Sequence, residues 1–250
     1  MAGVSAYLGA LNEANGKVEE GIYCYKHASE VPEDIQKYWH QRHRIFSKYD
    51  EGIWMTNNDW FGVTPEPVAM KIAEHLAQMA SPEKTIIIDA FGGAGGNSIA
   101  FALSKRWKQV FYIEKNPLTL KCARHNAEVY GVKNKIVFIQ GDCFEQLTLR
   151  FQGRRREAVL FASPPWGGPT YKGDEIFDAE RMEPYSLRKL YDAFTKISPD
   201  LVLYLPRSTN LNQVAKYANE EDQKTQVIHY CVDGASKALC VYYGNFLRLP

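Results

Sequence analysis

Residues 85–103 read TIIIDAFGGAGGNSIAFAL, and this stretch decides the fold. Its first part, Thr85 to Phe91, is rich in β-branched residues and has the length of a strand. The glycine-rich part, Gly92 to Gly96, permits a tight turn and lets the backbone approach a ligand closely. The last part, Asn97 to Leu103, has a helical pattern. Strand, glycine turn and helix in this order predict the nucleotide-binding entry of a doubly wound α/β sheet.

A carboxylate ends the next apolar run along the chain. The run Val110–Ile113 is followed by Glu114, 21 residues after Gly93. In nucleotide-binding sheets an acidic residue at about this distance accepts hydrogen bonds from the ribose of the bound nucleoside. We therefore expect Glu114 to bind a ribose, with the glycine loop beside it.

The loop is compatible with either a dinucleotide or a methyl donor, because both use this geometry. Ser98 stands where the dinucleotide motif has its third glycine. Asp89, directly before the turn, could accept a hydrogen bond from the ammonium group of S-adenosylmethionine, which carries no pyrophosphate. These two residues favour S-adenosylmethionine over a dinucleotide.

A second motif, Ser163-Pro164-Pro165-Trp166-Gly167-Gly168, follows the apolar run Ala158–Ala162. The two prolines fix φ near −65° and remove two backbone donors, which leaves nearby carbonyls free to accept from an NH₂ group. Trp166 could cover the ring that carries this amine. The motif favours methyl transfer to an exocyclic amine, and its alternative is a proline-rich surface turn with a half-buried tryptophan.

Composition limits the classes of protein and partner. A chain of 250 residues can bury a full core, and a net charge of +1 implies no broad basic face for a long nucleic acid. The five cysteines are odd in number and lack C-x-x-C spacing, which predicts reduced thiols in the cytosol or nucleus. Residues 1–15 lack the basic region of a secretory signal, and no apolar run is long enough to predict a membrane span.

Strand and helix patterns alternate from Thr85 onward. Only a short turn at Asp233-Gly234 separates the last two strands, which predicts an antiparallel hairpin. Strands are expected near residues 85–90, 109–114, 135–140, 157–162, 200–205, 225–231 and 238–244. Helices are expected at 97–106, 117–130, 185–197 and 210–219. This pattern predicts an α/β fold with the Rossmann-like seven-stranded sheet of a class I methyltransferase.

Upstream of the sheet we expect a small helical N-terminal extension. Pro32 opens an amphipathic helix that carries Ile35, Trp39 and Phe46 on one side, and residues 50–52 end it. Its basic residues are either a solvated face or a charged cap over the active site.

A further helix is expected to follow, with Thr64 as its cap and Pro65 at its first position. We accordingly divide the chain into an accessory segment, residues 1–64, which caps the active site, and a methyltransferase domain, residues 65–250.

Two weaker signals concern single residues. Asp142 follows the third expected strand, where it could receive the adenine amino group or cap the turn at Phe144. His40 and His43 are three residues apart without further ligands nearby, so we expect no metal site.

Several stretches together resemble one family. Besides Asp89–Asn97 and Ser163–Pro169, they are Phe46–Ile53, Trp60-Phe61, Val63–Glu66, Asn126–Gly131 and Leu205–Arg207. They are similar to the trimethylguanosine synthase family, which are RNA cap guanosine-N2 methyltransferases, over roughly residues 22–245. The departures are mild at Gly92, Ser98 and Glu114, where the family often has Cys, Thr and Asp. Trp54 lies where some relatives carry a lysine that meets the cap phosphates, so that contact is in doubt.

The resemblance implies transfer of methyl groups from S-adenosylmethionine to N2 of an N7-methylguanosine cap. The product would be 2,2,7-trimethylguanosine on small nuclear and nucleolar RNAs. The resemblance also implies a monomer that acts in the nucleus and nucleolus, with the cytoplasm as a second compartment. Small ribonucleoprotein proteins would be its partners, and no membrane is involved.

The resemblance and the motifs together assign roles to named residues. The cofactor-binding residues are expected to be Phe61, Thr64, Asp89, Gly93, Gly95, Asn97, Glu114, Asp142 and Ser163. The catalytic residues are expected to be Ser163, Pro164 and Trp166. The residues that bind the cap are expected to be Trp166, Tyr171, Arg207 and Lys48.

Two other functions remain open on the sequence. One is an amino-group methyltransferase of the Asn/Asp-Pro-Pro-Tyr type, acting on adenine or on a glutamine side chain. Ser163 and Trp166 argue against it, because an amide or carboxylate acceptor is expected at the first position. The other is a catalytically inactive RNA-binding module, against which the intact motifs argue.

Overall fold

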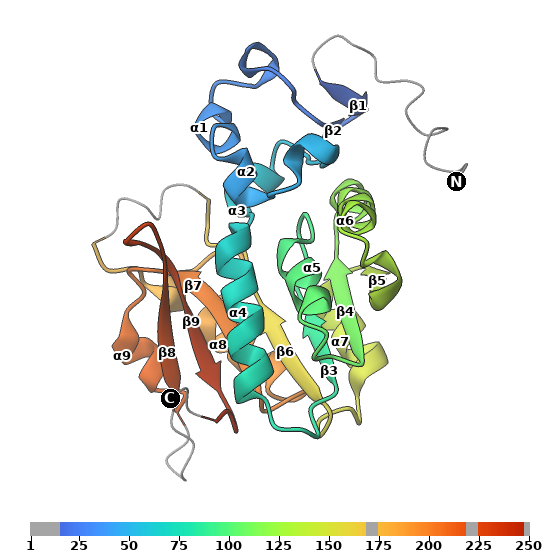
Figure 1. Cartoon of the computed structure of the whole chain (residues 1–250). Coiled ribbons are helices and arrows are strands. Elements are labelled where there is room, and N and C mark those ends of the chain that lie inside the picture. Colours follow the sequence, from blue (N-terminus) through green and yellow to red (C-terminus); the bar gives the residue numbers. More distant parts are fainter. Residues whose placement is uncertain (1–15, 169–174, 219–224, 248–250) are drawn as a thin grey trace.

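The computed structural model describes residues 16–168, 175–218 and 225–247, and a seven-stranded sheet forms its centre (Figure 1). The strands lie in the order β5-β4-β3-β6-β7-β9-β8. The first five are parallel, whereas β9 runs antiparallel to β7 and to β8. Their bounds are β3 (Ile86–Asp89), β4 (Gln109–Glu114), β5 (Ile136–Gln140), β6 (Ala158–Ala162), β7 (Leu201–Pro206), β8 (Gln226–Val232) and β9 (Ala235–Tyr243). The expected class I methyltransferase sheet is confirmed, including its hairpin at Asp233-Gly234.

The central strand β3 explains why residues 85–103 decide the fold. All four of its residues are buried, and it pairs with β4 on one side and β6 on the other. Ile87 belongs to the core on one face of the sheet, while Ile86 and Ile88 belong to the core on the other. A parallel strand covered on both faces requires such a continuous apolar run.

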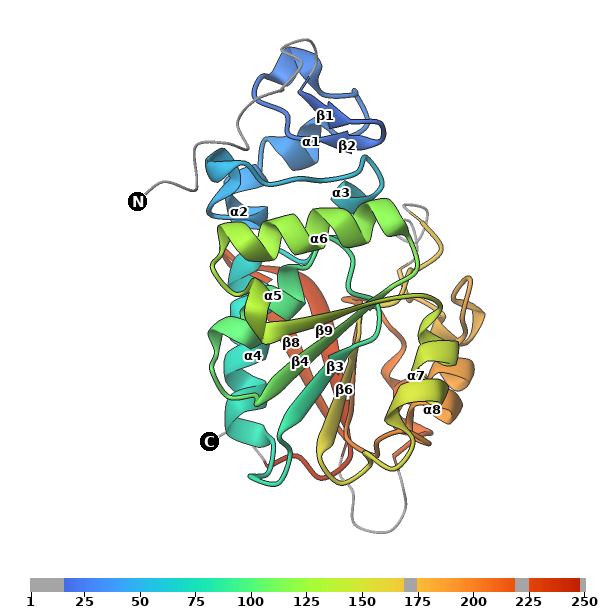
Figure 2. The same cartoon turned by 90° about the vertical axis from the view of Figure 1, so that its right-hand side faces the viewer.

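Helices cover both faces of the sheet (Figures 1 and 2). One face is covered by α4 (Glu66–Met79), α5 (Gly96–Leu103) and α6 (Pro117–Val129). The other is covered by α7 (Cys143–Phe151), α8 (Leu187–Phe194) and α9 (Leu211–Ala215). Among the helices of the described ranges, none combines the length and apolarity needed to cross a membrane.

Helix α7 was not among the expected helices. Its buried residues, Cys143, Leu147 and Phe151, recur at every fourth position and point to the sheet. Asp142 caps it by accepting a hydrogen bond from the Phe144 amide. A stripe of one apolar residue per turn in a polar stretch is a weak helical signal.

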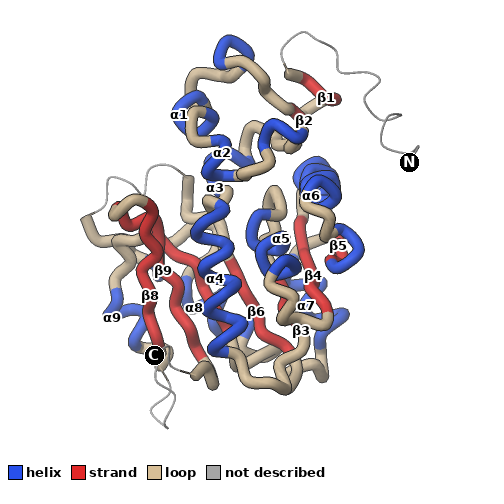
Figure 3. Tube along the Cα trace, viewed as in Figure 1, coloured by secondary structure: helices blue, strands red, loops and turns tan. Residues whose placement is uncertain are grey.

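The single helix expected from Pro32 onward is wrong. Two short helices, α1 (Gln36–Trp39) and α2 (Arg42–Ile45), replace it. At the break the Gln41 side chain donates to the Lys37 carbonyl (3.0 Å). The backbone amide of Gln41 donates to the Tyr38 carbonyl instead. The helical hydrogen-bond ladder is thereby interrupted. A third short helix, α3 (Asp59–Gly62), and a hairpin of β1 (Lys17–Glu19) and β2 (Ile22–Tyr23) complete this N-terminal segment, which is largely loop (Figure 3).

The expectation for Thr64 as a helix cap is also wrong. Helix α4 begins at Glu66 with Pro65 in the capping position, and no side chain caps it. The Thr64 hydroxyl instead accepts a hydrogen bond from the Asn97 side chain (3.1 Å). It therefore links the end of the N-terminal segment to the start of α5.

The N-terminal segment shares a core with the sheet. Phe46, Trp60 and α4 contribute to one continuous apolar cluster on the face that α4, α5 and α6 cover. Helix α6 lies between the segment and the sheet (Figure 2). The segment is therefore held over the carboxyl ends of the parallel strands, where a doubly wound sheet binds its ligands.

Candidate active site

A cavity of about 1080 Å³ lies at the carboxyl ends of the parallel strands. Part of its wall comes from the N-terminal segment, at Tyr38, Gln41, Ile45 and residues 58–64. The rest comes mainly from the turns after the strands, at residues 90–94, 113–115, 141–143, 163–166 and 207–208. The cavity spans the point where the strand order reverses, between β3 and β6. This is the position at which open α/β sheets bind nucleotides.

The glycine loop is held in place by strand β4. The Gly93 amide donates to Glu114 Oε2 (3.1 Å), and the Tyr112 hydroxyl donates to the Gly93 carbonyl (2.7 Å). Gly93 has a φ of +51°, which a side chain would strain. The other Glu114 oxygen accepts from the Asn116 amide (2.8 Å). Glu114 and Gly93 thus lie together in the cavity wall, as their spacing indicated.

Asp89 lies behind this loop rather than in the cavity wall. Its side chain is fully buried, Oδ2 accepts from the Ser98 hydroxyl (2.7 Å), and Oδ1 has no hydrogen-bond partner. Burial raises the pKa of Asp89 to about 7, although the Ser98 hydrogen bond opposes the shift. Gly95 also lies behind the cavity, where a β-carbon would come within 3.2 Å of the Ala123 side chain. Its expected cofactor contact would therefore be indirect.

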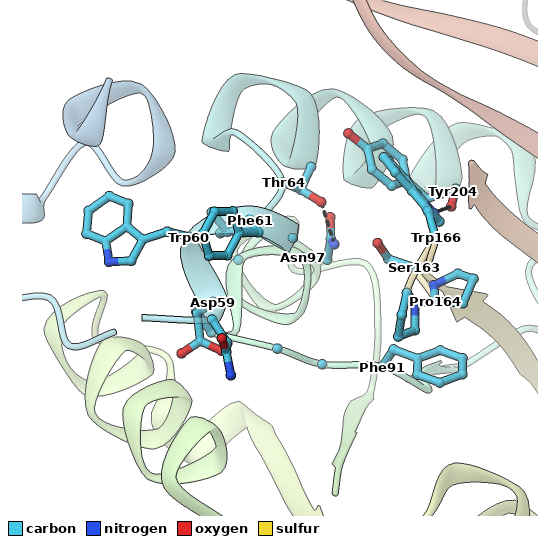
Figure 4. Close-up of a pocket in the computed structure, with 18 of the residues that line it drawn as sticks. Asp59, Trp60, Phe61, Thr64, Phe91, Asn97, Ser163, Pro164, Trp166 and Tyr204 are labelled. Carbon is cyan, nitrogen blue, oxygen red and sulfur yellow. Dashed lines mark hydrogen bonds between the residues drawn. The ribbon is translucent and has the colours of Figure 1, made fainter. Parts of the chain in front are cut away.

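We call the part of the cavity beside the glycine loop, Glu114 and Asn97 the donor end. It contains a hydrogen-bond acceptor that has no partner. Asn97 donates its Nδ2 to Thr64, whereas Asn97 Oδ1 is buried and has no hydrogen-bond partner. Buried polar atoms are rarely left unpaired, so this oxygen fits a ligand that brings a donor such as an ammonium group. Phe61, which is 38% exposed, lies in the same wall and points into the cavity (Figure 4). S-adenosylmethionine, which carries an ammonium group, fits this set of groups, and the ribose contact of Glu114 stays a prediction.

Asp142 has the capping role that the sequence offered as one alternative, and its contact with the adenine amino group stays a prediction. It caps α7 through Phe144, and it also lines the cavity beyond Glu114. Lys115 Nζ lies 3.8 Å from its second oxygen. Cys143 and Tyr185 complete this part of the wall, and burial raises the pKa of the Cys143 thiol to about 12. The thiol therefore stays protonated and acts as an apolar surface at neutral pH.

Asp59 is a cavity residue that sequence reasoning missed. It accepts from the Thr119 hydroxyl (3.0 Å) and from the Thr56 amide (2.8 Å), which joins α3 to α6. Burial raises the pKa of Asp59 to about 6, with nearby Glu114 adding to the shift. Carboxylates from Asp59, Glu114 and Asp142 give this end of the cavity a negative potential suited to a cationic donor. An isolated aspartate at the start of a one-turn helix carries no local signal for this role.

The Ser-Pro-Pro-Trp loop forms the acceptor end. Trp166 Nε1 donates to the Tyr204 carbonyl on β7 (3.2 Å), and the two rings lie 5.6 Å apart. Pro164 of the same loop is buried. The Ser163 hydroxyl points into the cavity and has no side-chain hydrogen-bond partner among the described residues (Figure 4). The loop therefore directs a tryptophan ring and a hydroxyl toward the donor end.

Two cations lie at the mouth of the acceptor end. Arg207 Nη1 donates to the Ser236 carbonyl (3.3 Å), so the guanidinium rests on the β8–β9 hairpin beside Lys237. Neither cation forms an ion pair within the described ranges. Tyr204 and Lys237 were not predicted as site residues. An aromatic residue late in the run before Pro206 could have indicated Tyr204, but nothing local indicates Lys237.

One expected cap-binding residue lies away from the cavity, and another lies outside the described residues. Lys48 does not line the cavity, because its ammonium group pairs with Glu51 (2.9 Å). Tyr171 lies outside the described residues. Within the described ranges, no group of three or more potential metal ligands is clustered.

Comparisons with known proteins agree with this geometry. The family model for RNA cap guanine-N2 methyltransferases matches residues 84–246. The trimethylguanosine synthase of Schizosaccharomyces pombe is 37% identical over 85% of this chain and 87% of its own length. That of Saccharomyces cerevisiae is 32% identical over 84% of this chain and 67% of its own length.

Solved structures support the fold. A proposed methyltransferase from Porphyromonas gingivalis W83 superposes with a TM-score of 0.64 and 15% identity, over 88% of this chain and 55% of that one. A SAM-dependent methyltransferase from Agrobacterium tumefaciens superposes with a TM-score of 0.50 and 17% identity, over 73% of this chain and 63% of that one. The family match covers most of the chain and includes both the glycine loop, Gly92 to Gly96, which we also call the donor loop, and the Ser-Pro-Pro-Trp loop. The chain therefore belongs to the RNA cap guanine-N2 methyltransferases, enzymes that transfer a methyl group from S-adenosylmethionine to N2 of the cap guanine.

Proposed function

We propose that this chain methylates N2 of an N7-methylguanosine cap twice and so produces 2,2,7-trimethylguanosine. The observation that carries the proposal is the position of Trp166 and Ser163, which face the donor loop across one continuous cavity. The names of the two yeast relatives, both trimethylguanosine synthases, support the same product.

Positioning is the main requirement of this reaction. Guanine N2 is a weak nucleophile because its lone pair is delocalised into the ring. S-adenosylmethionine, when bound, supplies an electrophilic methyl group. We propose that the Ser163 hydroxyl and the carbonyls near Pro164 accept hydrogen bonds from the two N–H groups of guanine N2. These bonds turn the lone pair of N2 toward the donor end. The methylated nitrogen becomes acidic and loses its proton to solvent, so no strong base is needed.

Trp166 would select the N7-methylated base. Methylation at N7 makes guanine cationic, and tryptophan is the best aromatic partner for a cation. The Trp166 ring is fixed by its hydrogen bond to the Tyr204 carbonyl and by the neighbouring Tyr204 ring. A stack on this ring would favour the cationic base by ~0.5–2 kcal/mol over neutral guanine.

Arg207 would bind the triphosphate bridge of the cap. Its guanidinium can form paired hydrogen bonds to phosphate oxygens, and its anchor on Ser236 keeps it at the mouth of the acceptor end. Lys237 lies beside it and would add charge. Lys48, which the sequence suggested for this role, is turned toward Glu51, so we assign the contact to Arg207 first.

The test compares substrates in a methyl-transfer assay. We expect labelled donor to methylate an N7-methylated cap dinucleotide about 2- to 30-fold more efficiently than its unmethylated counterpart. Adenine-containing DNA and a glutamine peptide should accept no methyl groups. Equal use of the two dinucleotides would contradict the selection by Trp166, and methylation of DNA or peptide would contradict the acceptor class.

Substitutions at Trp166 provide the matched control. Trp166→Ala should lose almost all cap methylation, whereas Trp166→Phe should retain part, because a ring face with a weaker quadrupole remains. Both variants should bind S-adenosylhomocysteine as the parent does, since Trp166 lies at the acceptor end.

We extend the proposal to the biological setting. Small nuclear and nucleolar RNAs are the proposed substrates, small ribonucleoprotein proteins the partners, and the nucleus with its nucleolus the principal compartment, with the cytoplasm second. The chain would act as a monomer, because the described residues of one chain supply both ends of the cavity. Depletion of the protein should remove trimethylated caps from small nuclear RNAs, as measured by cap-specific antibody capture. Unchanged capture would contradict this part.

A further inference from the structure

Asn126, a residue outside the cavity, joins the donor loop to the N-terminal segment. It is fully buried on α6. Its Oδ1 accepts from the Trp54 amide (2.8 Å), and its Nδ2 donates both to the Trp54 carbonyl (2.9 Å) and to the Ala94 carbonyl (3.0 Å). Ala94 belongs to the glycine loop and lines the cavity. One amide group is therefore shared between the donor loop and the loop that leads to α3.

The hydrogen-bonding capacity of Asn126 explains why an amide occupies this position. Two donors and one acceptor are needed at a single side chain, and both donors of its NH₂ group are used. No hydroxyl or carboxylate supplies that set. Because the group is buried, loss of any one bond would leave an unpaired backbone group in the interior.

The neighbouring residue, His125, contacts the loop around Trp54 in a different way. Its ring stacks on Trp54 with the centroids 3.7 Å apart, and its Nε2 forms a hydrogen bond with the Gly52 carbonyl (2.8 Å). Among the described residues, no hydrogen bond or ring contact joins His125 to the glycine loop. His125 therefore holds the N-terminal segment onto α6, whereas Asn126 holds it onto the donor loop.

Residues of the N-terminal segment on both sides of Trp54 line the cavity. Asp59 and Phe61 lie at the donor end, and the earlier residues Tyr38 and Gln41 also line the wall. A shift of the glycine loop would thus be passed through Asn126 to residues that surround the ligands.

We propose that Asn126 is a positioning residue that couples the donor loop to the N-terminal segment, so that donor and capped RNA bind cooperatively. A donor that fixes the glycine loop would fix the Ala94 carbonyl, then the Asn126 amide, and then the Trp54 backbone. Ordering the segment in advance lowers the entropy that cap binding must lose. The part of this inference that concerns RNA rests on the proposed function.

The first test uses the unmodified protein and no RNA. Hydrogen exchange of the Trp54 amide reports directly on its bond to Asn126. We expect saturating S-adenosylhomocysteine to slow this exchange about fivefold or more, the lower range of measured couplings between sites. An exchange rate that S-adenosylhomocysteine leaves unchanged would overturn the proposal, whether or not any variant folds.

The second test compares two variants on the same helix. Asn126→Asp keeps an acceptor for the Trp54 amide but loses the donors to Trp54 and Ala94, so the amide should stay protected yet no longer respond to S-adenosylhomocysteine. If this variant fails to fold, Asn126→Ala, which introduces no buried charge, is measured instead. His125→Ala is the matched control: it should raise the basal exchange rate and keep the response.

The third test measures reciprocity. In the parent, S-adenosylhomocysteine should tighten binding of an N7-methylated cap dinucleotide about fivefold or more, and the dinucleotide should tighten S-adenosylhomocysteine by the same factor. Asn126→Asp should bring both factors close to one, whereas His125→Ala should not. If both variants lose the two enhancement factors equally, Asn126 has only a structural role. A protein that shows the Trp54 response but methylates no cap would refute the proposed function and leave the coupling intact.

Discussion

At the scale of the residue, burial shapes the ionisation of the donor site. Asp89 is fully enclosed behind the glycine loop, and a charge there is poorly solvated. The Ser98 hydroxyl stabilises one of its oxygens, but the other has no partner. Nearby Glu114 opposes ionisation further, so the pKa of Asp89 rises to about 7. Asp89 therefore changes charge within the physiological range.

This shift predicts how stability depends on pH. Because the pKa of Asp89 is raised above its unfolded value of 3.8, its stabilising contribution is complete below about pH 4 and is lost as the pH rises through about 7. The difference of about three pKa units corresponds to at most about 4 kcal/mol. Asp89→Asn should remove this contribution, so its free energy of unfolding in denaturant titrations should fall less than that of the parent between pH 4 and 8.

The same variant tests the contact to the donor. If the ammonium group of the donor interacts with the Asp89 carboxylate, it favours the ionised form of Asp89. S-adenosylhomocysteine should then bind the parent more tightly at pH 8 than at pH 6. Asp89→Asn should show a flat profile over this range in calorimetry. Parallel pH profiles for parent and variant would assign Asp89 to the structure of the loop alone.

At the scale of the element, the short helix α3 separates structure from function within two adjacent residues. Trp60 is 2% exposed and points into the core that the N-terminal segment shares with α4. Phe61 points into the cavity (Figure 4) and meets Tyr38 edge to face at 5.5 Å. Helix α3 has one turn and depends on the burial of Trp60 rather than on its own hydrogen bonds.

Alanine substitutions should separate the two functions of α3. Trp60→Ala removes a large buried side chain, so it should lower the free energy of unfolding by about 3–5 kcal/mol. Phe61→Ala should leave stability nearly unchanged and weaken binding of S-adenosylhomocysteine. Thermal melting and calorimetry on both variants provide the comparison. A Phe61→Ala protein that binds normally would show that Phe61 has no contact with the donor.

At the scale of the whole molecule, the end of the sheet opposite the cavity contains a buried ion pair. Lys84, just before β3, lies 2.6 Å from Asp200, just before β7, and both side chains are almost fully buried. Lys84 also donates to the Arg155 and Ala158 carbonyls, and Asp200 accepts from the Asn245 amide. The pair connects β3, β6, β7 and the chain after β9. Neither Lys84 nor Asp200 lines the cavity.

Breaking this pair should destabilise the fold without altering the site. Lys84→Met leaves the Asp200 carboxylate buried and unpaired, which should lower the free energy of unfolding by about 3–5 kcal/mol. The double variant Lys84→Met with Asp200→Asn should recover part of that loss, since no buried charge remains. Chemical denaturation measures both effects. At a temperature where the variants are folded, their KM for the donor should equal that of the parent, and a changed KM would show that the pair acts on the site.

Local patterns determined much of this molecule. The run before Asp89, the glycine loop and the position of Glu114 follow from periodicity and spacing along the chain, because a strand, a turn and the next strand are close in sequence. The Ser163–Trp166 loop was predicted for the same reason, since its prolines restrict the backbone whatever surrounds them. The positions of the strands along the chain and the final hairpin followed from the alternation of patterns, whereas their order in the sheet came from the structure.

Only the tertiary structure decided which distant residues meet. Asp59, Tyr204 and Lys237 come from three separate elements and reach one cavity through packing, which no local pattern encodes. The same applies to the three hydrogen bonds of Asn126 and to the position of Lys48, which is turned toward Glu51. The break at Gln41 also depends on a side chain that competes with the backbone for one carbonyl. Such contacts depend on the arrangement of the whole chain, whereas a sequence pattern reports only periodicity and near neighbours.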